Sequence, residues 1–247
     1  MKVLGIIPAR YGSTRFPGKP LAMIGEKTMI CRTYEQVLKS SLDDVVVATD
    51  DQRIFDEVLT FGGKAVMTRA DHKSGTDRCR EALDLMGGNY HAVVNIQGDE
   101  PFIDPKMVDQ VTDLIRRDDT CLATLAKRIT DPSMIDNPNV VKVVFDVRGD
   151  ALYFSRHPLP FVRGCERDRW IEKVDYFRHI GIYAYKADTL RTIASMPMGR
   201  LEQAESLEQL RWLENGLHIR VAVTQCDDSI AIDTPQDLLN IPQEILQ

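Results

Sequence analysis

The chain has 247 residues, with 31 Lys and Arg against 37 Asp and Glu, a formal net charge of −6 and 43% hydrophobic residues. This length and composition are typical of one large globular domain, and the acidic balance argues against general binding to nucleic acid or anionic membranes. The five cysteines include no C-x-x-C pair, which argues against a disulfide framework or structural zinc and favours the reducing cytoplasm. No apolar run approaches the ~18 residues of a membrane span, and the first residues lack the shape of a signal peptide.

Short apolar runs alternate with amphipathic stretches through the first hundred residues. We expect buried strands at 3–7, 45–48, 64–67 and 92–96, and helices at 28–39, 52–61 and 77–86. Boundary signals support these helices, since Asp50 can cap the helix that starts at residue 51, and Ser74 with Asp77 forms a capping box. Fully apolar strands that alternate with helices predict a mostly parallel, Rossmann-like α/β sheet covered on both faces.

The second half of the chain is less regular. Further strands are expected at 121–126, 140–145, 181–185 and 218–223. The charged, proline-bearing stretch 157–173 is interpreted as a loop or excursion, whereas the leucine-rich stretch 201–216 predicts one helix, and a last helix begins at Pro235. We therefore expect a single domain over 1–247, with a smaller excursion over about 150–190 that binds a substrate or a second subunit.

A cationic loop follows the first strand. It combines three cations with small residues that leave backbone N–H groups accessible: Arg10, Arg15, Lys19, Gly12, Ser13 and Gly18. No acidic residue precedes Glu26, and ligands of open α/β sheets bind beyond the carboxyl ends of the strands. The loop is therefore predicted to bind an anion such as a phosphate; the alternative is a solvated loop with ordinary surface cations. The spacing matches neither G-x-G-x-x-G nor a Walker A sequence.

Two carboxylates at strand ends have no predicted structural task. Asp99 follows the strand 92–96, but the next helix has its own cap in Asp104 before Pro105. Asp233 follows a predicted strand end, but Thr234 can cap the last helix. Two such carboxylates near an anion-binding loop predict a Mg²⁺ site, provided that the two residues meet in space.

Nine stretches, in order along nearly the whole chain, resemble the 3-deoxy-manno-octulosonate (Kdo) cytidylyltransferases, or CMP-Kdo synthetases. They are IPARYGSTRFPGKPL (7–21), VVVATDD (45–51), MTRADHKSGTDR (67–78), VVNIQGDEP (93–101), NPNVVKVV (137–144), ALYFSR (151–156), RHIGIYAY (178–185), LEQLRWLENG (207–216) and IDTP (232–235). The resemblance implies a nucleotide-diphospho-sugar transferase fold, a homodimer, and a Mg²⁺-dependent reaction in which CTP and Kdo give CMP-Kdo and pyrophosphate for lipopolysaccharide biosynthesis. The chain departs from the pattern at GEKTMI (25–30) and at 157–173.

The resemblance also implies roles for individual residues. The nucleotide site would comprise Pro8, Ala9, Arg10, Gly12, Ser13, Lys19, Ser74, Gly75 and Arg78, with Arg10 and Lys19 on the triphosphate and Ser74 and Gly75 at the cytosine. Asp99 and Asp233 would hold magnesium and, with Arg10 and Lys19, form the catalytic group. The sugar site would comprise Gln97, Arg156, His179, Tyr183, Glu208 and Gln209.

Several of these residues have other interpretations. His179 can be a structural histidine, Arg156 calls for an anionic or acidic partner if it is buried, and Glu208 and Gln209 alone would be taken for the exposed face of a helix. At the level of function, a related sugar acid such as 8-amino-Kdo or a sialic acid, and a non-catalytic nucleotide-binding module, remain as alternatives.

Overall fold

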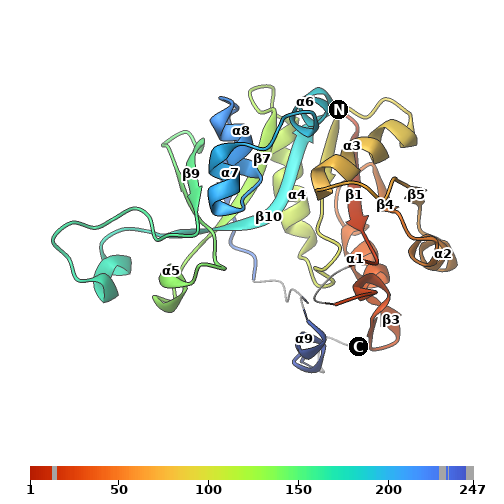
Figure 1. The fold of residues 1–247 in the computed structure, drawn as a ribbon, viewed down its shortest axis with the longest axis horizontal. Helices are drawn as coiled ribbons and strands as arrows, with labels where there is room; N and C mark the ends of the chain where they lie inside the picture. The colour runs from red at the N-terminus through yellow and green to blue at the C-terminus, as the bar shows by residue number, and fades with distance from the viewer. Residues whose placement is uncertain (13–15, 228–231, 233, 243–247) are drawn as a thin grey trace.

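A mixed β-sheet forms the centre of the protein (Figure 1). The computed structural model describes residues 1–12, 16–227, 232 and 234–242. Along the sheet the strands run in the order β11 (Arg220–Val223), β7 (Leu122–Arg128), β10 (Phe177–Lys186), β6 (Ala92–Asn95), β1 (Val3–Ala9), β4 (Asp44–Thr49) and β5 (Ala65–Met67), with β8 (Lys142–Phe145) and β9 (Ala151–Ser155) attached beside β10. The predicted parallel pairing is confirmed for β1 with β4 and β6, for β4 with β5, and for β11 with β7.

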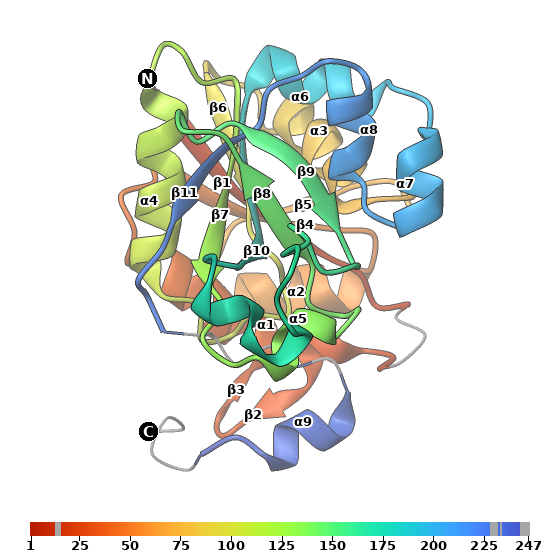
Figure 2. The same cartoon turned by 90° about the vertical axis from the view of Figure 1, so that its left-hand side faces the viewer.

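Helices cover both faces of the sheet, as the alternating pattern predicts (Figure 2). Packed on one face are α1 (Met29–Val37), α2 (Gln52–Thr60) and α4 (Pro105–Arg116). On the other lie α3 (Gly75–Met86), α6 (Ala187–Ala194), α7 (Arg200–Glu205) and α8 (Gln209–Glu214). Side chains of β1 point alternately to the two faces of the sheet, so Ile7 packs in the core on one face and Ile6 in the core on the other. Among the described helices, none combines the length and hydropathy that a membrane crossing requires.

Strand β10 is the main departure from a parallel sheet. It pairs antiparallel with β6 and β7, and its register shifts between Ile180 and Tyr183. It is also longer than the predicted strand 181–185 and reaches back to Phe177.

The excursion leaves the sheet beyond β8 and β9 and extends away from the rest of the fold (Figure 1). It contains the short helix η2 (Arg167–Glu172), which packs near α5 (Ser133–Asp136). A small separate core is formed by Ile129, Ile135, Trp170 and Tyr176. Trp170 belongs to the stretch 157–173, so its burial in this core anchors that stretch.

A short hairpin and the C-terminal helix form a third structural group. The segments are η1 (Lys19–Leu21), β2 (Met23–Ile24), β3 (Lys27–Thr28) and α9 (Pro235–Leu239). Ile24, Met29, Ile232 and Ile241 share one buried cluster, which ties the end of the chain to its beginning. The predicted capping box of α9 is confirmed, because the Thr234 N–H donates to Asp237 at 2.7 Å.

Two local predictions are wrong. The stretch 201–216 forms two helices instead of one, because Ser206 adopts a left-handed conformation with φ 53° and ends α7. The cap of α2 is Asp51 and not Asp50: the Asp51 carboxylate accepts the Arg53 N–H at 3.0 Å, whereas Asp50 binds Arg78.

Candidate functional site

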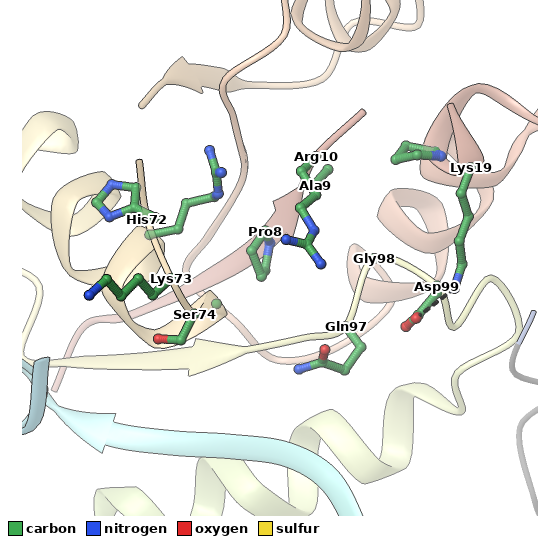
Figure 3. Close-up of a pocket in the computed structure, with 13 residues that line it drawn as sticks. Pro8, Ala9, Arg10, Lys19, His72, Lys73, Ser74, Gln97, Gly98 and Asp99 are labelled. Atoms are coloured by element: carbon green, nitrogen blue, oxygen red, sulfur yellow. Dashed lines mark hydrogen bonds and ion pairs between the residues drawn. The ribbon is translucent and has the colours of Figure 1, made fainter. Parts of the chain in front are cut away.

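A pocket of ≈ 290 Å³ opens at the carboxyl ends of β1 and β6, beside the first turn of α3. It is lined by Pro8, Ala9, Arg10, Lys19, Pro20, His72, Lys73, Ser74, Gly75, Arg78, Gln97, Gly98 and Asp99. Figure 3 shows Lys19 and Asp99 at one end, His72, Lys73 and Ser74 at the other, and Arg10 between them. Parallel pairing of β1 with β6 therefore brings the cationic loop and the Gln97–Asp99 turn together.

Packing of side chains holds the described ends of the cationic loop together at Tyr11 and Gly18. The Gly18 N–H donates to the Tyr11 carbonyl at 2.9 Å, and Gly18 has φ +71°, which favours glycine. A Cβ at residue 18 would lie 3.0 Å from the Tyr11 ring. The Arg53 guanidinium stacks 3.4 Å from the centre of that ring, and Asp51 holds Arg53 through two hydrogen bonds of 2.9 and 2.7 Å.

Lys19 and Asp99 form an ion pair at one end of the pocket. The Lys19 Nζ lies 2.8 Å from Asp99 Oδ2, and the two side chains are 11% and 37% exposed. Asp99 is not the cap of α4, which is Asp104, as predicted. The Ile232 N–H donates to the Asp99 carbonyl at 3.1 Å, so Ile232 lies beside Asp99.

The start of α3 forms the other end of the pocket. Ser74 caps the helix, as predicted, by accepting the Asp77 N–H at 3.2 Å. Arg78 is buried and fixed by Thr68 at 2.5 Å and Asp50 at 3.2 Å. Because two partners bind its guanidinium, Arg78 keeps its position when a ligand binds.

Sequence reasoning missed four lining residues: Pro20, His72, Lys73 and Gly98. His72 bonds to the Glu81 carboxylate, and its side chain is 4% exposed. Burial alone would raise the pKa of Glu81, but hydrogen bonds from His72 and from the Arg69 N–H lower it, so Glu81 stays ionised beside the ring. The sequence feature that could have identified His72 as a pocket residue is its position two residues before Ser74, which caps α3.

Of the residues predicted for the sugar acid, Gln97 lines the pocket, whereas the other five are not among its lining residues. The Gln97 Cγ lies 3.9 Å from the place where a Cβ of Gly181 would stand, in the irregular part of β10. His179 and Tyr183 flank that glycine, and their ring centres are 5.2 Å apart. Gln97 therefore joins the pocket to the predicted sugar residues.

His179 is an uncharged hydrogen-bond donor at one ring nitrogen. Its Nε2 lies 3.0 Å from Thr124 Oγ1, whose single hydrogen is directed at the carbonyls of Ile180 and Ile182 at 3.1 and 2.7 Å. Nε2 therefore carries the proton and donates, which leaves Nδ1 as an acceptor. Burial, together with the Arg178 charge, lowers the pKa of His179 from 6.5 to about 3.

Glu208 and Gln209 are not on an exposed helix face. Gln209 is buried, and Glu208 accepts a hydrogen bond from Thr76 at 2.9 Å. Among the described residues, the Arg156 guanidinium binds backbone carbonyls instead of a carboxylate: it donates to the carbonyls of Glu205 and Pro138 at 2.7 and 2.9 Å. Its partner is thus the C-terminal end of α7, where helix carbonyls carry negative partial charge.

Ser13 and Asp233 lie outside the described residues. Gly12 is exposed and is not among the lining residues of the pocket. In the part of the chain that is described, no three His, Cys, Asp or Glu side chains gather in a way that could hold a metal.

Comparisons with known proteins identify relatives of the chain. The family model described as cytidylyltransferase matches residues 4–219. The chain is 54% identical over 241 residues to a 3-deoxy-manno-octulosonate cytidylyltransferase of Bacteroides thetaiotaomicron, covering 96% of each chain, and 53% identical to one of Phocaeicola vulgatus, covering 96% of this chain and 95% of the relative. A solved CMP:2-keto-3-deoxy-manno-octonic acid synthetase complexed with CTP superposes with TM-score 0.89 and 43% identity, over 97% of this chain and 96% of the other.

The protonation state of His179 leads to a prediction about stability. Because the unfolded ring binds a proton near pH 6.5 and the folded ring only near pH 3, the free energy of unfolding should fall as the pH is lowered through this range. His179→Gln, whose amide can still donate to Thr124, should show a smaller fall in urea unfolding measured from pH 7 to pH 4. The exposed His218→Gln is the control and should behave like the wild type. Equal pH dependence in all three proteins would contradict the neutral ring.

Proposed function

The chain belongs to the 3-deoxy-manno-octulosonate cytidylyltransferase family, and we propose that it couples CTP with Kdo to give CMP-Kdo and pyrophosphate. One observation carries the proposal: a single pocket joins the cationic loop of β1, the Ser74–Gly75 turn and Asp99. Gln97, at the same pocket, leads to a second group of polar residues suited to a sugar acid.

The chemistry is a displacement at the α-phosphorus of CTP. The 2-hydroxyl of Kdo attacks, its proton is lost to solvent, and the bond to the pyrophosphate oxygen breaks in line with the attack. Arg10 and Lys19 bind the triphosphate, where their positive charge favours the departure of pyrophosphate. Ser74 and Gly75 hold the cytosine with Arg78 nearby, which orients the α-phosphate for the attack.

Mg²⁺ is the proposed cofactor. The Asp99 carboxylate suits this hard ion, since it is an oxygen donor, caps no helix and remains 37% exposed at the phosphate end of the pocket. Asp99 and Asp233 are the proposed ligands. When bound, the ion polarises phosphate oxygens and lowers the pKa of the attacking hydroxyl. Lys19, which pairs with Asp99 in the described structure, is then available to the phosphates.

The sugar acid is proposed to lie between Gln97 and the start of α8. There His179 accepts a hydroxyl hydrogen at Nδ1, because its Nε2 donates to Thr124. Tyr183 and Glu208 each keep a buried oxygen without a hydrogen-bond partner in the described part of the chain. Gln209 completes the group, whereas Arg156 shapes it by binding the end of α7.

We also propose that the protein acts as a homodimer in the cytoplasm and serves lipopolysaccharide biosynthesis. The excursion exposes large apolar side chains, with Leu152 at 63% and Phe161 at 74% exposure. A second copy of the chain would cover these side chains and remove their apolar surface from water.

The function is tested by incubating the protein with CTP, Mg²⁺ and one sugar acid at a time, and by measuring pyrophosphate. Kdo should give turnover well above that of 8-amino-Kdo or a sialic acid. Turnover with another acid but not with Kdo would overturn the proposed substrate. Calorimetric binding of CTP with no turnover on any acid would favour a non-catalytic nucleotide-binding module.

Asp99→Asn should lower kcat by ~10² or more, because it removes a negative charge from the proposed metal site while the shape of the side chain is kept. The measurement is pyrophosphate release over a titration of Mg²⁺, in which the variant should also need more of the ion. Asp188→Asn, at a carboxylate that is 98% exposed, is the control. Wild-type activity of the Asp99 variant at limiting Mg²⁺ would contradict the role.

Lys19→Ala should raise the KM for CTP and lower kcat, because the ammonium group is the proposed partner of the departing phosphates. Lys39→Ala removes an equal charge from an exposed position near the end of α1 and should change neither constant by more than about twofold. If steady-state kinetics show the same small effect for both variants, the loop is not the triphosphate site.

A further inference from the structure

One hydrogen bond joins the nucleotide end of the pocket to the predicted sugar residues. The Thr76 hydroxyl donates to Glu208 Oε2 at 2.9 Å, across 132 positions of the sequence. Thr76 lies in the first turn of α3, directly after Ser74 and Gly75, and Glu208 directly precedes α8. Among the described side chains, this bond directly links the turn proposed for cytosine to the helix that carries Gln209.

The bond is shielded from water. Thr76 is 2% exposed, and Glu208 Oε1 is buried with no hydrogen-bond partner in the described part of the chain. Tyr183, whose hydroxyl is also buried and unpartnered, packs on Trp212 of α8 with ring centres 5.2 Å apart. A buried polar atom without a partner is costly, so a carboxyl held at Oε2 with Oε1 unpaired is arranged for a ligand.

Burial raises the pKa of Glu208, while the nearby Thr76 and Ser74 hydroxyls oppose the rise. The Thr76 hydroxyl therefore affects both the orientation and the ionisation of this carboxyl. The titratable and charged groups that act on Glu208 or feel its charge are Asp77 and Cys79 of α3, Arg211 of α8, and Tyr183 and Tyr185 of β10.

We propose that Thr76 is a positioning residue for the sugar acid: its hydroxyl holds Glu208 Oε2 so that Oε1 accepts a hydroxyl of the sugar, and it ties this geometry to the nucleotide-binding turn. The inference rests on the proposed function and adds a residue to it. Thr76 does not line the pocket and acts through Glu208.

The test compares Thr76→Val, which keeps the shape but removes the donor, with Thr76→Ser, which keeps the donor. In Thr76→Val the KM for Kdo should rise about tenfold or more, while the KM for CTP stays within about twofold, because a hydrogen bond to a carboxylate is lost at the sugar side alone. Thr76→Ser should restore most of the affinity for Kdo. The control is Thr112→Val, at a buried threonine of α4 whose hydroxyl bonds within its own helix at 2.6 Å; it should leave both constants unchanged.

Two further measurements separate positioning from a general loss of structure. The KM for Kdo should rise as the pH falls through the pKa of Glu208. In Thr76→Val this rise should occur at higher pH, because the hydrogen bond that favours the ionised carboxylate is lost. In a Glu208→Gln background, Thr76→Val should add less than about twofold to the KM for Kdo, since the two residues act as one unit.

An equal rise of both KM values in Thr76→Val, no rescue by Thr76→Ser, or full additivity with Glu208→Gln would overturn the assignment. Wild-type turnover of Kdo is measured first. Failure of the proposed function therefore appears in the wild type, whereas failure of the Thr76 assignment appears only in the variants.

Discussion

The parallel pairing of β1 with β4 and β6 is the constraint on which the site depends. Strands that run in the same direction end at the same edge, so the loop after Ala9 and the turn at Gln97–Asp99 lie side by side, and the Lys19–Asp99 ion pair can form between them. The antiparallel strand β10 then brings His179 and Tyr183 from the opposite direction to the same neighbourhood. One edge of the sheet thus carries both the pocket and two of the residues proposed for the sugar acid.

Charges at the site are balanced in pairs before any substrate arrives. Lys19 meets Asp99, Arg78 meets Asp50, and His72 meets Glu81. Buried or half-buried charges would otherwise cost several kcal/mol each, so the carboxylates hold the Lys19 and Arg78 side chains in place. The CTP proposed for this pocket would therefore meet side chains that are already oriented.

Much of the framework could be predicted because the local signals agreed with the global fold. Apolar runs matched β1, β4 and β6, and the caps at Ser74 and Asp104 marked the true helix starts. The break at Ser206 could not be predicted, because the apolar spacing continues through it and the left-handed turn is stabilised by distant partners: Ser155 and Arg156 bind Glu205.

The candidate site likewise contains some residues that could be predicted from the sequence and others that could not. The pocket residues at strand ends that followed from chain order and resemblance are Pro8, Ala9, Arg10, Lys19, Gln97 and Asp99. The contributions of His72 and Thr76 did not, because each depends on a partner that only the folded chain brings near, Glu81 and Glu208 respectively.

Gly18 and Tyr11 illustrate how such a loop restricts its own evolution. The backbone at residue 18 has φ +71°, and the aromatic ring occupies the volume that any larger residue would need. A side chain at residue 18 would be strained by the backbone alone, whereas loss of the ring at residue 11 would relieve only the crowding. Residue 18 should therefore stay glycine in descendants of this gene even where residue 11 varies.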